Sequence, residues 1–285
     1  MRFYDESMGA GRPVVFLPGA GWPGRQGLII GELMAKTHLF AMLDLPGYGR
    51  SQGTVASASD RAVADWLVSY LDAQGWPSAH VVGHSLGGYV ALTLAYYYPE
   101  RTDSLTLLDV GPMKVPRWHS QPGIFGYVVP FLSLAERIVG VAGLARMLNG
   151  LDSGNAQEPL EIRMQQYVDK GVYRLSDHRY LALALDYEPQ LDVGGLTLLF
   201  AMYRSDLPRL LQRVRVPTLL VYATRPSGSP SIQERIQKAV GRALARNPNL
   251  ESLAVNGGHY VHWMESGVAQ AIVRHIDKLD SGPSH

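Results

Sequence analysis

The sequence predicts an α/β fold in which helices pack on a mainly parallel sheet. Short apolar runs alternate with longer amphipathic stretches over most of the chain, which is the pattern of successive β-α-β units. Residues 79–95 place an apolar run, a tight turn and an apolar helical segment in direct succession, as one such unit requires. The alternation stops from about Pro112 to Leu211, so this segment is expected to be an insertion between two strands.

Each expected element follows from these patterns. The apolar runs predict strands at Val14–Leu17, Leu39–Leu43, His80–Val82, Leu105–Leu108, Thr218–Tyr222 and Leu253–Val255. The amphipathic stretches predict helices at Gln26–Lys36, Ser59–Gln74, Leu86–Tyr98, Ile232–Arg246 and Val268–Leu279. In sheets of this kind the chemistry gathers at the carboxyl ends of the strands, so the residues that follow each strand are the candidates for a site.

The turn at residues 83–87 reads Gly-His-Ser-Leu-Gly and matches the pattern G-x-S-x-G between a strand and a helix. Such a turn strains the serine backbone, and Gly83 and Gly87 supply the space that it needs. It lifts Ser85 Oγ clear of the sheet, while His84 is expected to point away. The pattern therefore predicts Ser85 as a nucleophile.

The turn after the first expected strand, residues 18–21, carries little side-chain bulk. The N–H groups of Ala20 and Leu86 are the expected oxyanion hole, and losing one such donor typically costs about 10²–10³ in rate. A plain glycine turn is the alternative. The following turn, residues 44–51 (DLPGYGRS), is expected to be structural, with Asp44 accepting hydrogen bonds from nearby N–H groups.

A serine nucleophile at neutral pH needs a base, and histidine is the natural supplier. His259 follows a glycine pair in the loop after the last expected strand, where it is expected to reach Ser85. His262 lies three residues further on, in the expected first turn of a helix. His259 is therefore the predicted base.

The order of Ser85 and then His259, on this sheet, resembles the serine hydrolases of the α/β-hydrolase superfamily, esterase- and lipase-like proteins with a helical cap. The matching segments are Gly19-Ala20, DLPGYGRS, GHSLGG and GGHYVHWME, spread over essentially the whole chain. The resemblance implies the α/β-hydrolase fold with a helical cap inserted after the sixth strand. It implies a serine nucleophile but names no substrate, because this fold hosts many chemistries.

The insertion defines the expected domains: residues 1–111 and 212–285 form the α/β-hydrolase core, and residues 112–211 form the helical cap, or lid. Five apolar side chains of the cap are expected either to line a substrate pocket or to form the core of the cap itself: Phe125, Tyr127, Phe131, Met147 and Met164.

The chain departs from the family pattern in two places. Pro18 precedes Gly19 where the family usually has histidine. The family usually places its third triad residue, an Asp, in the loop after the strand at 218–222, but residues 223–230 contain no carboxylate. Asp109, which ends the neighbouring strand, is the preferred substitute, and the alternatives are Glu234, Asp206, another acid from the cap, or no acid.

Composition bounds the remaining possibilities. The chain has 285 residues, 46% of them hydrophobic and 18% charged, which is typical of a globular protein. A net charge of +1 gives no reason to expect nucleic acid as a partner. The absence of cysteine excludes disulfides and cysteine-ligated metals. No apolar run is long enough to span a bilayer and no signal segment precedes the fold, so a cytoplasmic location is expected.

The leading hypothesis is a serine hydrolase of the carboxylesterase type, acting on a small apolar ester, thioester or lactone without a metal or an organic cofactor. The serine argues against the dehalogenases and epoxide hydrolases of this fold, which attack with Asp. Hydrolysis of a carbon–carbon bond is the alternative within the fold, and acyl transfer to an acceptor other than water is a third reaction. A ligand-binding or sensor protein with little turnover is the alternative from another class. The sequence does not indicate the oligomeric state.

Overall fold

The structure, a computed structural model, describes residues 1–114, 132, 135, 138–146, 158–187, 192–225 and 230–282. Within them, seven strands form one sheet in the order β1-β3-β2-β4-β5-β6-β7. Their bounds are β1 Asp5–Gly9, β2 Pro13–Leu17, β3 Leu39–Leu43, β4 Ala79–His84, β5 Thr102–Leu108, β6 Thr218–Ala223 and β7 Leu250–Val255. All neighbours are parallel except β1, which pairs with β3 antiparallel, so the mainly parallel sheet is confirmed.

The helices connect these strands in the expected alternation. The α-helices are α1 Leu28–Met34, α2 Asp60–Gln74, α3 Leu86–Tyr97, α5 Leu160–Asp169, α6 Arg179–Leu185, α7 Val193–Arg204, α8 Leu207–Leu211, α9 Pro230–Arg246 and α10 Ser266–Asp280. Three short 3₁₀ turns are η1 Gly24–Gly27, η2 Pro99–Arg101 and η3 Val261–Trp263. Residues 138–146 are also helical. No helix of the described chain is both long and apolar enough to cross a bilayer.

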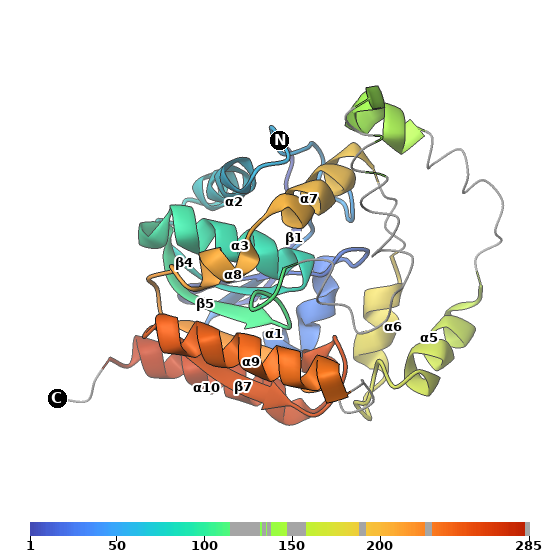
Figure 1. Ribbon diagram of the computed structural model, residues 1–285. Coiled ribbons are helices and arrows are strands. Elements are labelled where there is room, and N and C mark those ends of the chain that lie inside the picture. The colour runs from blue at the N-terminus through green and yellow to red at the C-terminus, as the bar shows by residue number, and fades with distance from the viewer. Residues whose placement is uncertain are drawn as a thin grey trace.

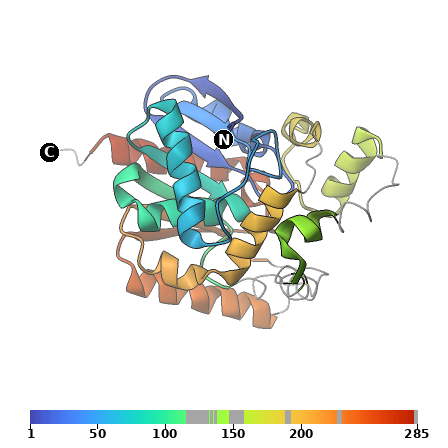
Figure 2. The same ribbon diagram turned by 90° about the horizontal axis from the view of Figure 1, so that it is seen from above.

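Alternate residues of each strand serve two hydrophobic cores, one on each face of the sheet. On β2, Val15 and Leu17 pack with side chains from α2, α3 and α9, whereas Val14 and Phe16 pack with side chains from α1 and α10. Figure 1 shows α3 against the sheet with α2 and α7 further out on the same side, and Figure 2 shows α2 crossing over the strands. The central strands β2 to β6 are thus buried on both faces, and their ends are the parts left open to function.

The segment between β5 and β6 supplies helices in two places, beside α2 and α3 and beyond the carboxyl ends of the strands. α8 packs against α3, and α7 packs against α2 and α3. α5 and α6 lie on the side to which the arrowheads of β5 and β7 point (Figure 1). This segment follows β5, the strand expected at Leu105–Leu108. It is the fifth of the described strands, whereas the resemblance counted it as the sixth.

Three elements differ from the sequence expectation. β1 is an additional edge strand, which carries too few apolar residues to show a period-two pattern. The helix expected at Gln26–Lys36 divides into η1 and α1, since a Cβ at Gly27 would lie 2.5 Å from the Phe16 ring and Gly27 has left the α conformation. β7 begins three residues earlier than expected, because its exposed Glu251 and Ser252 conceal the strand pattern.

The DLPGYGRS turn is structural, as expected. Asp44 Oδ1 accepts a hydrogen bond from the Gly24 N–H at 2.6 Å, and its Oδ2 accepts one from the Arg50 N–H at 2.8 Å. Gly47 has a φ of +76°, and a Cβ there would lie 1.9 Å from Gly195 N at the start of α7. Glycine at this position therefore allows α7 to pack closely on the turn.

Candidate active site

The turn between β4 and α3 has the strained geometry that the sequence predicts. Ser85 has φ 51° and ψ −113°, a conformation that L residues rarely adopt. A Cβ at Gly83 would lie 2.5 Å from Gly87 O, and one at Gly87 would lie 2.3 Å from Leu17 O, so both positions need glycine. The Ser85 N–H donates to Leu108 O at 3.1 Å, which fixes the turn against β5. Ser85 therefore sits on a rigid support at the carboxyl end of the sheet.

Asp109 follows β5 directly and is 1% exposed. Its Oδ2 lies 2.6 Å from Nδ1 of His259, and its Oδ1 accepts a hydrogen bond from the Ala223 N–H at 2.9 Å. Its own N–H donates to Val221 O at 2.7 Å. The sheet thus holds the Asp109 carboxylate in place from β6, and the structure brings Asp109 and His259 together.

The other two carboxylates weighed from the sequence are engaged elsewhere in the described structure. Glu234 is exposed and pairs with Lys238 on its own helix at 2.5 Å. Asp206 pairs with Lys114 at 2.8 Å and caps α8 through the Arg209 N–H. Asp109 is the one of the three that contacts His259.

Arg225 is a site residue that the sequence reasoning did not identify. It lies in the loop after β6, where the resemblance expects the acid, and its guanidinium forms an ion pair with Asp109 Oδ2. It is 8% exposed, and its N–H donates to Gly257 O at 3.0 Å. The same carboxylate oxygen therefore faces two cationic or potentially cationic groups, Arg225 and His259. The sequence did carry a signal for Arg225: it is a charged residue in the loop where the family usually has a carboxylate and this chain has none.

Backbone strain gathers at this edge of the sheet. Among the described residues other than glycine, positive φ angles occur at Ser85, Asp109 and Arg225 only, with values of 51°, 54° and 53°. These residues follow β4, β5 and β6, three adjacent strands. Conformations of this kind cost about 1–3 kcal/mol each and persist where the surrounding structure enforces them, typically at functional sites.

His259 lies in the loop after β7, and the buried side chains of His84 and His262 pack near that loop. His84 Nε2 lies 3.1 Å from the His259 carbonyl oxygen, and the two rings are 4.7 Å apart. Burial, aided by the nearby His259 and His262, lowers the pKa of His84 well below its usual value. Burial likewise lowers the pKa of His262 to about 3. His84 and His262 are therefore neutral at pH 7 and support the loop, whereas His259 is partly exposed.

The two expected oxyanion donors lie in turns that are bonded to each other. The Gly87 N–H donates to Pro18 O at 3.0 Å, which ties the start of α3 to the turn after β2. The Gly19 N–H is used by Gln26 Oε1 at 2.8 Å. Ala20, next in the chain, is exposed, and Leu86 is the first residue of α3. The substitution of Pro18 for the family's histidine leaves this connection intact.

Aromatic side chains border the site on the side of His259. Trp22 lies between the rings of Tyr260 and Tyr167 at centroid distances of 5.7 and 5.4 Å, and its Nε1–H donates to Tyr260 Oη at 3.2 Å. Met164, on α5 with Tyr167, is partly buried against the same core. The other four cap residues weighed from the sequence, Phe125, Tyr127, Phe131 and Met147, lie outside the described residues.

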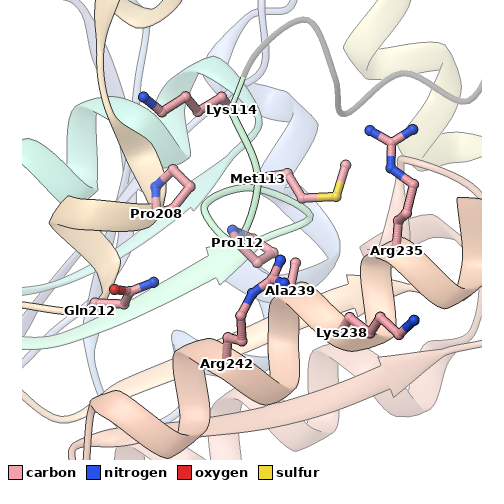
Figure 3. Close-up of a pocket in the computed structure, with 9 residues that line it drawn as sticks. All are labelled: Pro112, Met113, Lys114, Pro208, Gln212, Arg235, Lys238, Ala239 and Arg242. Atoms are coloured by element: carbon pink, nitrogen blue, oxygen red, sulfur yellow. The ribbon is translucent and has the colours of Figure 1, made fainter.

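A separate cavity of about 320 Å³ lies beside the segment that follows β5 (Figure 3). Its lining includes four basic side chains, namely Lys114, Arg235, Lys238 and Arg242. Ser85, His259 and Asp109 do not line it. The cavity is thus basic and distinct from the apolar substrate pocket that the sequence led us to expect.

Residues 12–266 match the model of the alpha/beta hydrolase fold family, so the chain belongs to this family. Among solved structures, E-2-(acetamidomethylene)succinate hydrolase superposes with a TM-score of 0.70 at 18% identity, covering 97% of this chain and 95% of that one. The same fold is therefore shared over nearly the whole length.

Two curated relatives illustrate the range of chemistry nearby. The pimeloyl-[acyl-carrier protein] methyl ester esterase of Chromobacterium violaceum is 26% identical over 81% of this chain and 82% of that protein. The 2-hydroxy-6-oxo-6-phenylhexa-2,4-dienoate hydrolase of Burkholderia cepacia is 32% identical, over 42% of this chain and 44% of that protein. With this hydrolase and two other curated relatives, the match spans only 28% to 44% of their own lengths.

Proposed function

We propose that the protein is a serine hydrolase that cleaves a carboxylic ester, thioester or lactone through an acyl-enzyme on Ser85. His259 acts as the base, and Asp109 is the triad carboxylate that orients His259. The observation that carries this proposal is the 2.6 Å contact of His259 Nδ1 with the buried Asp109. Ser85 is held on a strained turn at the end of β4, the strand beside β5. The esterase from Chromobacterium violaceum supports the ester as substrate class.

The proposed reaction uses each of these groups in turn. Asp109 holds the Nδ1–H tautomer of His259, which leaves Nε2 to take the proton of Ser85 as Oγ attacks the carbonyl carbon. The N–H groups of Ala20 and Leu86 stabilise the oxyanion. The tetrahedral intermediate expels the alcohol or thiol, which receives the proton from His259. His259 then takes a proton from water as the water oxygen attacks the acyl carbon. The bond from that carbon to Ser85 Oγ breaks, the carboxylic acid leaves, and His259 returns the proton to Ser85.

The proposed cap, residues 112–211, would close over this site. α5 and α6 lie on the side to which the carboxyl ends of the strands point (Figure 1), and Tyr167 of α5 contacts Trp22 beside the site. A cap in this position limits the size of the acyl group. The substrate is therefore expected to be small or medium in size, with an apolar acyl part against these aromatic rings.

Hydrolysis of a carbon–carbon bond is the second candidate. It is favoured by the relative from Burkholderia cepacia, whose name describes a hydrolase of a 2-hydroxy-6-oxo dienoate. A panel of p-nitrophenyl esters run beside such a dienoate separates the two reactions. The ester proposal expects the higher kcat/KM for an ester, and a higher value for the dienoate would replace it.

A fluorophosphonate probe is expected to label Ser85, because only a serine with an active base reacts rapidly with it. Mass spectrometry of the labelled peptide identifies the residue. Ser85→Ala should abolish the labelling, and replacing Ser51 by Ala, a serine outside the site, should leave it unchanged. A folded protein that does not react would contradict the proposal and favour the ligand-binding alternative.

A further inference from the structure

A second polar cluster lies at the opposite edge of the sheet, where the strands begin. It consists of His38, which directly precedes β3, His80, the second residue of β4, and Asp280, the last residue of α10. His38 and His80 are 3% and 1% exposed. Buried imidazoles facing a carboxylate, far from the catalytic edge, require an explanation that the proposed reaction does not supply.

The three side chains converge on one point. His38 Nε2 lies 2.7 Å from Asp280 Oδ2, and His80 Nε2 lies 3.1 Å from Asp280 Oδ1. The candidate ligand atoms of all three residues lie within 4.8 Å of one another. A tetrahedral zinc ion, with ligands at about 2.0–2.2 Å, places its ligand atoms roughly 3.2–3.5 Å apart. The two His–Asp pairs therefore need to open by only a few tenths of an ångström, and the two imidazoles need to move toward each other, to hold such an ion.

Thr37 links His38 to the end of α10. Its Oγ1 lies 2.8 Å from His38 Nδ1 and 3.2 Å from Asp277 Oδ1. These contacts orient the His38 ring so that Nε2 points at Asp280, where a metal ion would lie.

The local charge favours the metal ion. Three carboxylates, Asp103, Asp277 and Asp280, stand around the cluster in the described structure, against the single guanidinium of Arg12. The three carboxylates and Arg12 sum to a charge of −2, which matches a divalent cation.

We propose that His38 Nε2, His80 Nε2 and the Asp280 carboxylate form a binding site for a divalent transition metal, with zinc as the ion that this ligand set suits best. The other ring nitrogens already have the hydroxyl partners that orient metal-binding histidines: Thr37 for His38, and Ser104, at 2.7 Å, for His80. The resemblance to serine hydrolases implied no metal, and this ion would have no part in the chemistry at Ser85.

The bound ion would join the end of α10 to the starts of β3 and β4. These three segments are far apart in the sequence, so the metal would act as a cross-link between the carboxyl-terminal helix and the sheet. Binding to the folded state alone stabilises it in proportion to the logarithm of the metal concentration. Arg12, whose NH1 lies 2.5 Å from Asp280 Oδ1, competes with the ion for that oxygen.

The test is zinc binding by the full, untagged chain after removal of metals with EDTA, measured by equilibrium dialysis and by thermal unfolding. The wild-type protein should bind one high-affinity equivalent of Zn²⁺ and unfold at a higher temperature with it. Asp280→Asn, which keeps the size of the side chain, should lower the affinity by at least about 100-fold. His275→Gln, a histidine change on the same helix, is the matched control and should bind as the wild type does. Arg12→Gln should bind about fivefold more tightly, because a competing cation is removed.

Two results would overturn the proposal: no high-affinity zinc in the wild-type protein, or an unchanged equivalent in Asp280→Asn. If Asp280→Asn fails to fold, zinc K-edge absorption of the loaded wild-type protein decides instead. It should show two imidazole nitrogens and oxygen ligands, and a shell with fewer than two imidazoles would reject the site. Because neither measurement uses catalysis, the outcome is independent of the function proposed for Ser85.

Discussion

Asp109→Asn is expected to lower kcat by about 10⁴, with little change in the folded structure. The amide can still accept from the Ala223 N–H, so the carboxyl end of β5 keeps its bond to β6. It can no longer hold the Nδ1–H tautomer of His259 or stabilise the imidazolium. Steady-state hydrolysis of a p-nitrophenyl ester, with circular dichroism of the same sample, measures both parts of this prediction.

Glu234→Gln and Asp206→Asn are the matched controls for Asp109→Asn. Each removes one of the other carboxylates that the sequence brought into consideration, and each lies in a surface ion pair. Both should retain turnover close to that of the wild type. Turnover of Asp109→Asn within tenfold of the wild type would remove Asp109 from the catalytic machinery and return the search to an acid elsewhere or to a dyad.

Loss of His259 or Ser85 is expected to have the largest effect, about 10⁶ in kcat. The two residues act as a unit, since the serine is activated only when the histidine takes its proton. His259→Ala, Ser85→Ala and the double variant should therefore all lose nearly the same factor. Single-turnover assays at high enzyme concentration give the sensitivity that this comparison needs.

His275→Gln is the control for these losses, because His275 lies on α10, outside the proposed cap. It should turn over as the wild type does. Losses that add in the double variant would show that Ser85 and His259 act independently, which the proposed mechanism does not allow. A His259→Ala variant that keeps most of its activity would assign the base to another group.

Much of the fold was predictable because burial on both faces gives the central strands continuous apolar runs. β2 to β6 match these runs within one to three residues at each end. The edge strands were harder, because β1 and the first half of β7 are partly exposed and depend on their neighbours for pairing. The break in the helix expected at Gln26–Lys36 depends on the contact of Gly27 with Phe16, which is a tertiary effect.

The candidate site could be predicted from the sequence as far as local rules reach. The glycine spacing around Ser85 and the position of His259 after the last strand are visible in the chain itself. The preference for Asp109 came from its place at a strand end, and the structure shows it in contact with His259. Arg225 was not foreseen, because its ion pair joins residues 116 positions apart and depends on which strands are neighbours.

The position of Arg225 restricts how this site can have changed during evolution. β5 and β6 are neighbours, and the loop after β6 is where other members of the family place the acid that Asp109 is proposed to supply here. Moving the acid back takes two substitutions. Arg225→Asp made first would set two carboxylates against each other, and loss of Asp109 made first would leave a buried guanidinium without its partner. Each single change therefore leaves an uncompensated charge in a buried position, which is costly, so Asp109 and Arg225 can be exchanged only together.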